Sequence, residues 1–191
     1  GDLEHMNFDA ARTKAQTVRE RCQRAVSQLG VALAKREIKP ERPSVPTKID
    51  LLTYDAGIAL AMKENKPIVI DFTASWCGWC KRMDRETFAD ERVIRYMKDK
   101  YVPVKVWGDN STSGDMVFHN GEKVTQKALT QVFGVRGFPT FWFLDSAGGK
   151  IGPSPGYKKA DEFLALMEFI EGSHYKTMTY DSFMKKRNGK G

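Results

Sequence analysis

The sequence predicts an α/β protein in which helices flank a central mixed sheet, with a helical extension before that domain. Short apolar, β-branched segments alternate with helix-like segments through the middle of the chain, the pattern of a layered α/β fold. The length of 191 residues suits one domain with appendages, and 41% hydrophobic and 29% charged residues are typical of globular proteins. No apolar run approaches the roughly 18 residues needed to cross a bilayer, which excludes a membrane-spanning segment.

The N-terminal part of the chain differs in composition from the middle. Residues 1–6 end in His-Met and resemble a cloning scar. Residues 8–39 place apolar side chains three and four apart, which predicts a helix with one narrow apolar stripe. This helix is expected to lie against the protein body or to pair with a second subunit as a homodimer. Cys22 lies on the stripe and is expected to be a small buried hydrophobic residue; a third redox thiol or an intersubunit bond is the alternative.

Prolines mark the boundary between this helix and the main domain, because a helix cannot continue through Pro40, Pro43 and Pro46. We therefore expect four segments: a scar at 1–6, a helical extension with a proline-rich linker at 7–48, the main domain at 49–171, and a basic, solvated tail at 172–191.

The net positive charge belongs to the ends of the chain. The whole sequence has 31 Lys and Arg against 24 Asp and Glu, a net charge of +7. Residues 7–48 hold 10 bases and 4 acids (+6), residues 172–191 hold 5 and 1 (+4), and residues 49–171 hold 16 and 17 (−1). The aromatic residues gather near the cysteines rather than among the bases, so we expect no nucleic-acid partner.

The first elements of the main domain are expected before residue 100. Residues 55–65 have helical composition, and the apolar run at 68–72 after Pro67 predicts a strand. A helix is expected from about Gly78. Acidic residues at 90–91 before an apolar position predict another helix start, since acids stabilise the first turn.

The second half of the domain continues the alternation. β-Branched and aromatic residues favour strands, and 3.6-residue periodicity favours helices. These patterns predict a strand at 101–107, a polar loop at 108–123, a helix at 125–133, a strand at 140–144, a short strand near Ile151 and a closing helix at 158–171.

Cys77 and Cys80 are the only close pair among three cysteines, and they follow an expected strand at the expected start of a helix. A cysteine there faces unpaired N–H groups and the positive end of the helix dipole, which lower its pKa. With two residues between them, the sulfurs can close a small ring. Cys77 can then attack a disulfide and Cys80 can release the mixed disulfide, so the pair is predicted to be redox-active.

Other roles for this pair fit the sequence less well. A zinc site needs two further Cys or His ligands, and a c-type haem needs His at the position of Lys81. A structural disulfide at this spacing stays possible, although it would be strained and reducible. We expect no metal and no cofactor.

Several segments resemble the thioredoxin family when taken in order. They are Val69–Phe72, Ala74–Lys81, Val104–Val106, Val135–Thr140 and Gly156. Within the family, the stretch Glu86–Asp90 and the enlarged loop after residue 107 resemble the periplasmic and membrane-tethered branch, which includes the C-terminal domain of DsbD and SoxW-type proteins. The resemblance implies a thioredoxin fold over about 49–171.

The resemblance also implies roles for residues around the cysteines. Asp71 is expected to act as base for Cys80, because burial in an apolar strand raises a carboxyl pKa toward neutrality. Lys105 matches the basic partner of that acid; a purely structural Asp71–Lys105 ion pair is the alternative. Pro139 matches the family's cis-proline, next to which the backbone of Phe138 pairs with substrate.

Three further residues are expected at the substrate-binding surface. Trp76 and Trp79 flank the cysteines and would form an apolar collar, with Gly78 between them. Thioredoxins have Pro where Trp79 stands, and the oxidases and isomerases have His between the cysteines. We therefore expect an intermediate but still reducing potential.

Together these observations predict a thiol:disulfide oxidoreductase that reduces disulfides of exported proteins. A dimeric disulfide isomerase and a non-catalytic binding module are the alternatives. The expected partners are disulfide-bonded proteins and a redox donor, either thioredoxin reductase or a membrane reductase of DsbD type. No signal peptide is visible, and a scar directly before the extension fits a trimmed leader. We expect a periplasmic or otherwise exported bacterial protein, with a cytoplasmic location as the alternative.

Overall fold

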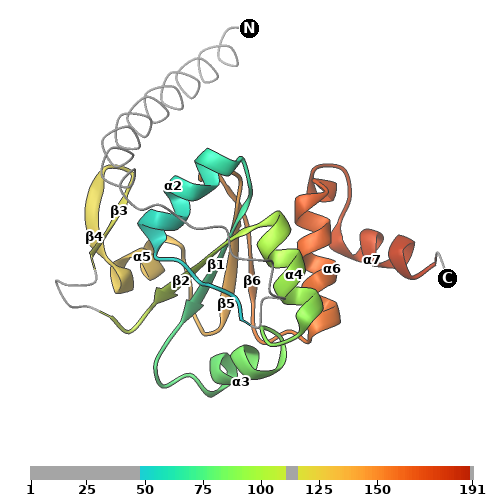
Figure 1. Cartoon of the computed structure of the whole chain (residues 1–191), viewed down its shortest axis with the longest axis horizontal. Coiled ribbons are helices and arrows are strands. Elements are labelled where there is room, and N and C mark those ends of the chain that lie inside the picture. The colour runs from blue at the N-terminus through green and yellow to red at the C-terminus, as the bar shows by residue number, and fades with distance from the viewer. Residues whose placement is uncertain (1–47, 111–115, 190–191) are drawn as a thin grey trace, which may run out of the picture. The chain divides into compact units, whose positions relative to one another are not determined.

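The computed structural model describes residues 48–110 and 116–189 and is organised around a four-stranded sheet (Figure 1). The strand order is β2-β1-β5-β6. β1 is parallel to β2 and antiparallel to β5, and β6 is antiparallel to β5, so the sheet is mixed as expected. The strands are β1 (Ile68–Thr73), β2 (Val102–Trp107), β5 (Thr140–Leu144) and β6 (Lys150–Pro155).

Five helices accompany this sheet close to the expected positions. Thr125 caps α5, because its side chain accepts a hydrogen bond from the N–H of Ala128 at 3.1 Å. Asp90 caps α4 in the same way through the N–H of Arg92 at 2.9 Å. None of the helices in the described ranges is long and apolar enough to cross a membrane. The five are α2 (Tyr54–Glu64), α3 (Gly78–Glu86), α4 (Glu91–Lys100), α5 (Gln126–Val132) and α6 (Ala160–Glu171).

β1 lies at the centre of the fold and is buried on both faces. Because side chains alternate along a strand, Ile68, Ile70 and Phe72 point to one face, where they pack against α2 and α5. Val69 points to the other face, which α3, α4 and α6 cover. Asp71 has the same parity as Val69 and therefore faces the helix that begins after Cys77.

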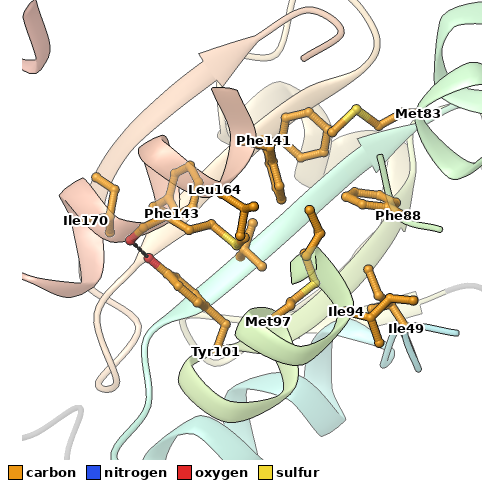
Figure 2. Packing of buried hydrophobic residues seen from close by; sticks show 14 of the residues in the cluster. Ile49, Met83, Phe88, Ile94, Met97, Tyr101, Phe141, Phe143, Leu164 and Ile170 are labelled. Atoms are coloured by element: carbon orange, nitrogen blue, oxygen red, sulfur yellow. Dashed lines mark hydrogen bonds between the residues drawn. The ribbon is translucent and has the colours of Figure 1, made fainter. Parts of the chain in front are cut away.

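Aromatic side chains fill the core on the α4 and α6 side (Figure 2). The ring of Phe163 lies 5.0 Å from that of Phe141 and 5.6 Å from that of Phe88, centre to centre. At the other end of this core, the Tyr101 hydroxyl donates to the carbonyl of Met167 at 2.6 Å, shown as a dashed line in Figure 2. These contacts fix α6 on the sheet and hold the start of β2 beneath it.

The expectation of a polar loop over 108–123 is wrong in its second part. Met116–His119 (β3) and Glu122–Thr125 (β4) form an antiparallel hairpin. Its turn is Asn120-Gly121, with φ values of 52° and 86°. Both residue types adopt positive φ readily, so this dipeptide is itself a strong hairpin signal in the sequence. The hairpin is fastened to α2 by a 2.8 Å hydrogen bond between Tyr54 Oη and His119 Nδ1.

The C-terminal segment, expected as a basic, solvated tail, contains helical structure in which Lys185, Lys186 and Arg187 are exposed. After a short 3-10 turn, η2 (His174–Lys176), the chain forms helix α7 (Tyr180–Asn188), which extends away from α6 in Figure 1. The ring of Phe169 lies 5.3 Å from the rings of both Tyr180 and Phe183. Aromatic packing therefore attaches this segment to α6.

The N-terminal expectations stay untested. The helix at 8–39, its apolar stripe, Cys22 and the linker prolines all lie outside the described residues.

Replacing Phe163 by alanine tests the aromatic core. We expect the free energy of unfolding to fall by about 3–5 kcal/mol, the usual loss for a fully buried phenylalanine. Urea denaturation at neutral pH measures it. Phe118→Ala is the matched control, because this ring is 59% exposed and its removal should cost less than about 0.5 kcal/mol. Equal losses in the two variants would contradict this description of the core.

Candidate active site

Cys77 and Cys80 are joined by a disulfide at the N-terminus of α3. Cys77 is the N-cap residue, one position earlier than the first turn, and its sulfur accepts a hydrogen bond from the N–H of Cys80 at 3.1 Å. Both residues are buried at 4% exposure. The unpaired N–H groups and positive dipole of a helix start stabilise negative charge. Once the disulfide is reduced, this position favours the thiolate of Cys77.

The residues beside the disulfide are mostly aromatic. Phe138 packs against the cluster formed by Ala74, Cys77 and Cys80, and its ring lies edge-to-face with that of Trp76, with centres 5.8 Å apart. Trp76 is 70% exposed and Trp79 is 56% exposed, so both tryptophans lie at the surface rather than in the core. Gly78 is exposed as well, with open space where a side chain would stand.

The segment opposite the disulfide contains a cis peptide bond between Phe138 and Pro139. The Pro139 carbonyl accepts from the N–H of Gly156 at 2.8 Å, and the Thr140 hydroxyl donates to the Gly137 carbonyl at 2.7 Å. Within the described part of the chain, the N–H and C=O of Phe138 have no backbone partner. The residue that packs on the cysteine cluster thus has backbone groups without a backbone partner.

Asp71 is buried beneath this surface and is linked to Lys105. Its register partner in β2 is Lys105, whose Nζ lies 3.6 Å from Asp71 Oδ2 and 3.3 Å from Asp84 Oδ1. Burial raises the pKa of Asp71 to about 7, although the positive charge of Lys105 opposes the shift. Asp71 Oδ1 is buried and has no hydrogen-bond partner among the described residues. A carboxyl group in this state can take up and release a proton near neutral pH.

No hydrogen bond in the described ranges joins Asp71 to either cysteine. The parity of Asp71 in β1 directs it to the face covered by α3, the helix that contains Cys80. Nor do those ranges contain a group of three or more His, Cys, Asp or Glu side chains arranged to bind a metal. The arrangement provides two sulfurs and a titratable acid, which is the equipment of thiol–disulfide exchange.

The family comparison agrees with this geometry. A model of the thioredoxin-like domain matches residues 54–171, more than half of the chain. The chain belongs to the thioredoxin-like family.

Relatives of this thioredoxin-like domain include long proteins with the same kind of cysteine chemistry. The thiol:disulfide interchange protein DsbD of Yersinia pestis is 32% identical over 111 residues, which cover 57% of this chain and 17% of DsbD. DsbD of Campylobacter jejuni is 37% identical over 104 residues, covering 54% and 16%. The chain thus matches less than a fifth of the length of either relative.

Solved structures show the same fold. A thioredoxin-fold protein from Helicobacter pylori superposes with a TM-score of 0.57 at 22% identity, covering 67% of this chain and 88% of that protein. Together with the Cys77–Cys80 disulfide, the family supports thiol–disulfide exchange as the general chemistry of the thioredoxin-like domain.

Two acidic residues at this site were missed in the sequence. Asp84 lies one helical turn after Cys80, so the spacing of four could have placed it on the same face of α3. Asp109 follows β2, and its Oδ2 accepts hydrogen bonds from the N–H of Ser75, at 2.9 Å, and from the Ser75 hydroxyl. Asp109 therefore holds the loop that leads into Trp76 and Cys77, and no local pattern indicates this contact across 34 residues.

Asp71→Asn tests the buried acid through the pH dependence of stability. Burial raises the pKa of this carboxyl group on folding. Between about pH 4 and pH 7 the folded protein therefore still holds a proton that the unfolded chain has released, and native stability falls as the pH rises through this range. Asparagine removes this effect. Relative to the unsubstituted protein, the variant should gain about 2–4 kcal/mol at about pH 8 and little near pH 4.

Urea denaturation of the oxidised protein at three pH values measures that difference. The exposed Asp99→Asn is the matched control, since removing a surface carboxylate should change stability by less than about 0.5 kcal/mol. A pH-independent difference for Asp71→Asn would show that burial does not raise this pKa.

Asp109→Ala tests the support of the loop before Cys77. The variant loses both hydrogen bonds to Ser75, so amide hydrogen exchange at Ser75 should accelerate about tenfold, corresponding to hydrogen bonds worth roughly 1–2 kcal/mol. Asp145→Ala is the control, since that side chain accepts from Ala147 and Gly149 in a different turn. Unchanged exchange at Ser75 would refute a role for Asp109 in holding the loop.

Proposed function

We propose that the protein is a thiol:disulfide oxidoreductase that reduces disulfides of exported proteins at Cys77-Gly78-Trp79-Cys80. The observation that supports this most is the disulfide at the N-cap of α3, packed against Phe138. The sulfurs are bonded to each other, the site favours the thiolate of the first, and an open backbone segment lies beside them. A binding module without turnover would need neither the disulfide nor a site that favours the thiolate.

In this proposal the reaction begins with both cysteines reduced. The Cys77 thiolate attacks one sulfur of the substrate disulfide, and the other substrate sulfur leaves as a thiolate and takes up a proton. Cys80 then loses its proton to Asp71 and attacks the Cys77 sulfur of the mixed disulfide. The second substrate sulfur leaves and is protonated in turn. The substrate gains two electrons and two protons, and Cys77 and Cys80 end as the disulfide seen in the structure.

Lys105 and Asp84 adjust this proton transfer. Lys105 balances the negative charge that Asp71 acquires when it is deprotonated, and Asp84 competes for the same ammonium group. The pKa of about 7 lets Asp71 accept the Cys80 proton and return it within one cycle.

The substrate would lie across the aromatic surface around the sulfurs. Trp76, Trp79 and Phe138 offer apolar contact area, and the free backbone groups of Phe138 can pair with an extended segment next to Pro139. Gly78 leaves room for that segment to approach.

Turnover requires a redox donor that reduces Cys77–Cys80 again, either thioredoxin reductase or a membrane reductase of DsbD type. The similarity to DsbD supports the second, and with it a periplasmic or otherwise exported location. We further propose an intermediate but still reducing potential, since Trp79 occupies the position that Pro has in thioredoxins. The proposal includes neither a cofactor nor a nucleic-acid partner.

Cys80→Ser tests the assignment of the two sulfurs. The variant keeps the attacking thiol but cannot resolve the mixed disulfide, so it should accumulate covalent, dithiothreitol-sensitive adducts with disulfide-bonded proteins. Non-reducing electrophoresis after incubation with insulin measures them. Cys77→Ser is the matched control and should trap far less.

Three outcomes would contradict this proposal. Equal trapping by both variants would reverse or remove the distinct roles of the cysteines. Failure of the folded, unsubstituted protein to reduce insulin would refute the reductase. Reactivation of scrambled ribonuclease by a dimeric protein would favour the isomerase instead.

A further inference from the structure

Trp79, one of the two exposed residues between the cysteines, contacts the side chains of Tyr157 and Arg82. Its ring centre lies 5.7 Å from that of Tyr157, and the guanidinium of Arg82 lies 5.4 Å from the Trp79 ring centre. Arg82 also lies 4.9 Å from the ring centre of Tyr157. Each of the three groups therefore contacts both of the others.

Glu86, the last residue of α3, forms hydrogen bonds with both Arg82 and Tyr157. Both of its carboxylate oxygens accept from Arg82 Nε, at 2.9 and 3.0 Å, and Oε2 also accepts from the Tyr157 hydroxyl at 2.6 Å. Glu86 thus holds the Tyr157 ring at its hydroxyl end and the Arg82 guanidinium at Nε. Neither group can turn away from Trp79 without losing a hydrogen bond to a charged partner.

Tyr157 comes from a different part of the chain than the other three residues. It follows Gly156, whose N–H donates to the carbonyl of Pro139 at 2.8 Å. Next along the chain, the carbonyl of Lys158 accepts from the Thr87 hydroxyl at 2.6 Å. Tyr157 therefore connects Trp79 on α3 to the segment that contains the cis peptide bond.

The Tyr157 ring also packs against the core, but the ion pair between Arg82 and Glu86 does little for the stability of the fold. The Arg82 and Glu86 side chains are 43% and 46% exposed, and ion pairs at such positions add little to stability. Fixing the Trp79 ring has a clearer consequence for binding. A freely rotating tryptophan must be ordered when a partner binds, whereas a ring held in place has already lost that freedom.

We propose that Tyr157 is a positioning residue, which, with Glu86 and Arg82, holds Trp79 as a preorganised wall of the protein-substrate surface. The inference rests on the proposed function and deepens it. Tyr157 acts through Trp79 and takes no part in sulfur chemistry. It selects for polypeptide disulfides, which extend over Trp79, against small disulfides, which reach only the sulfurs.

Comparison of two substrates tests this. Insulin serves as the polypeptide disulfide and 5,5′-dithiobis(2-nitrobenzoic acid) as the small one. In Tyr157→Ala, KM for insulin should rise about three- to tenfold with kcat within about twofold, the range that corresponds to one aromatic contact. The ratio of kcat/KM for insulin to that for the small disulfide should fall by the same factor.

Two further variants make the result specific. Tyr157→Phe keeps the ring and loses only the hydrogen bond to Glu86, so its ratio should fall less than that of Tyr157→Ala. It also serves if the alanine variant folds poorly by circular dichroism. Tyr96→Ala is the matched control: this half-buried tyrosine lies on α4 next to Tyr101, and its loss should leave the ratio unchanged.

An unchanged ratio in Tyr157→Ala would overturn the inference, and so would a fall of equal size in Tyr96→Ala. If the unsubstituted protein reduces neither substrate, the proposed function fails, and the position of Trp79 is tested by itself. Acrylamide quenching of the Trp79 fluorescence, isolated by difference against Trp79→Phe, should then rise in Tyr157→Ala. Unchanged quenching would show that Tyr157 does not hold the ring.

Discussion

The capping of α3 by the sulfur of Cys77 is the interaction on which the site depends. β1 runs through the core and ends beside the disulfide, and the connection is so short that the N–H of Cys77 donates to the carbonyl of Ala74 at 3.0 Å. The helix therefore begins at this point, and the N–H of Cys80 in its first turn donates to the sulfur. β2 reinforces the turn, because the N–H of Gly108 donates to the carbonyl of Thr73 and Asp109 accepts from Ser75. A reactive cysteine is thus placed by the same geometry that ends a buried strand.

At Asp71, the cost of burying a carboxylate is set against the attraction of the Lys105 ammonium group. An apolar residue at position 71 would continue the pattern of β1 and would not incur the desolvation of a buried carboxylate. Lys105 offsets part of that cost at 3.6 Å, but it is shared with Asp84, so the pKa of Asp71 stays near 7. Burial therefore outweighs the attraction of Lys105, and the raised pKa lowers native stability as the pH rises from about 4 to 7.

The proposed recognition surface lies beside the sulfurs rather than along the open edge of the sheet. β6 is an edge strand, but Pro153 and Pro155 have no N–H groups, which removes donors that an added strand would need. The backbone of Phe138 lies free next to the cis peptide bond, and aromatic rings stand on the surface around it. The hydrogen bond from the N–H of Gly156 to the carbonyl of Pro139 links this segment to Tyr157, the next residue after Gly156. A polypeptide can pair there only by passing close to the disulfide.

The sequence by itself determined the alternation of strands and helices, the cysteine pair at a helix start, and the identities of Asp71, Lys105 and Pro139. These features depend on periodicity, caps and short motifs, which a local stretch of chain contains in full. The Asn120-Gly121 turn is also a local signal in the sequence, and it indicates the β3–β4 hairpin within the segment expected as a loop. The partners of Asp109 and Tyr157 were decided only by the tertiary structure, because Ser75 and Glu86 lie 34 and 71 residues away from them. Such contacts depend on which strands pair and on how α3 and the β6–α6 connection meet over the sheet, and no short stretch of sequence encodes that meeting.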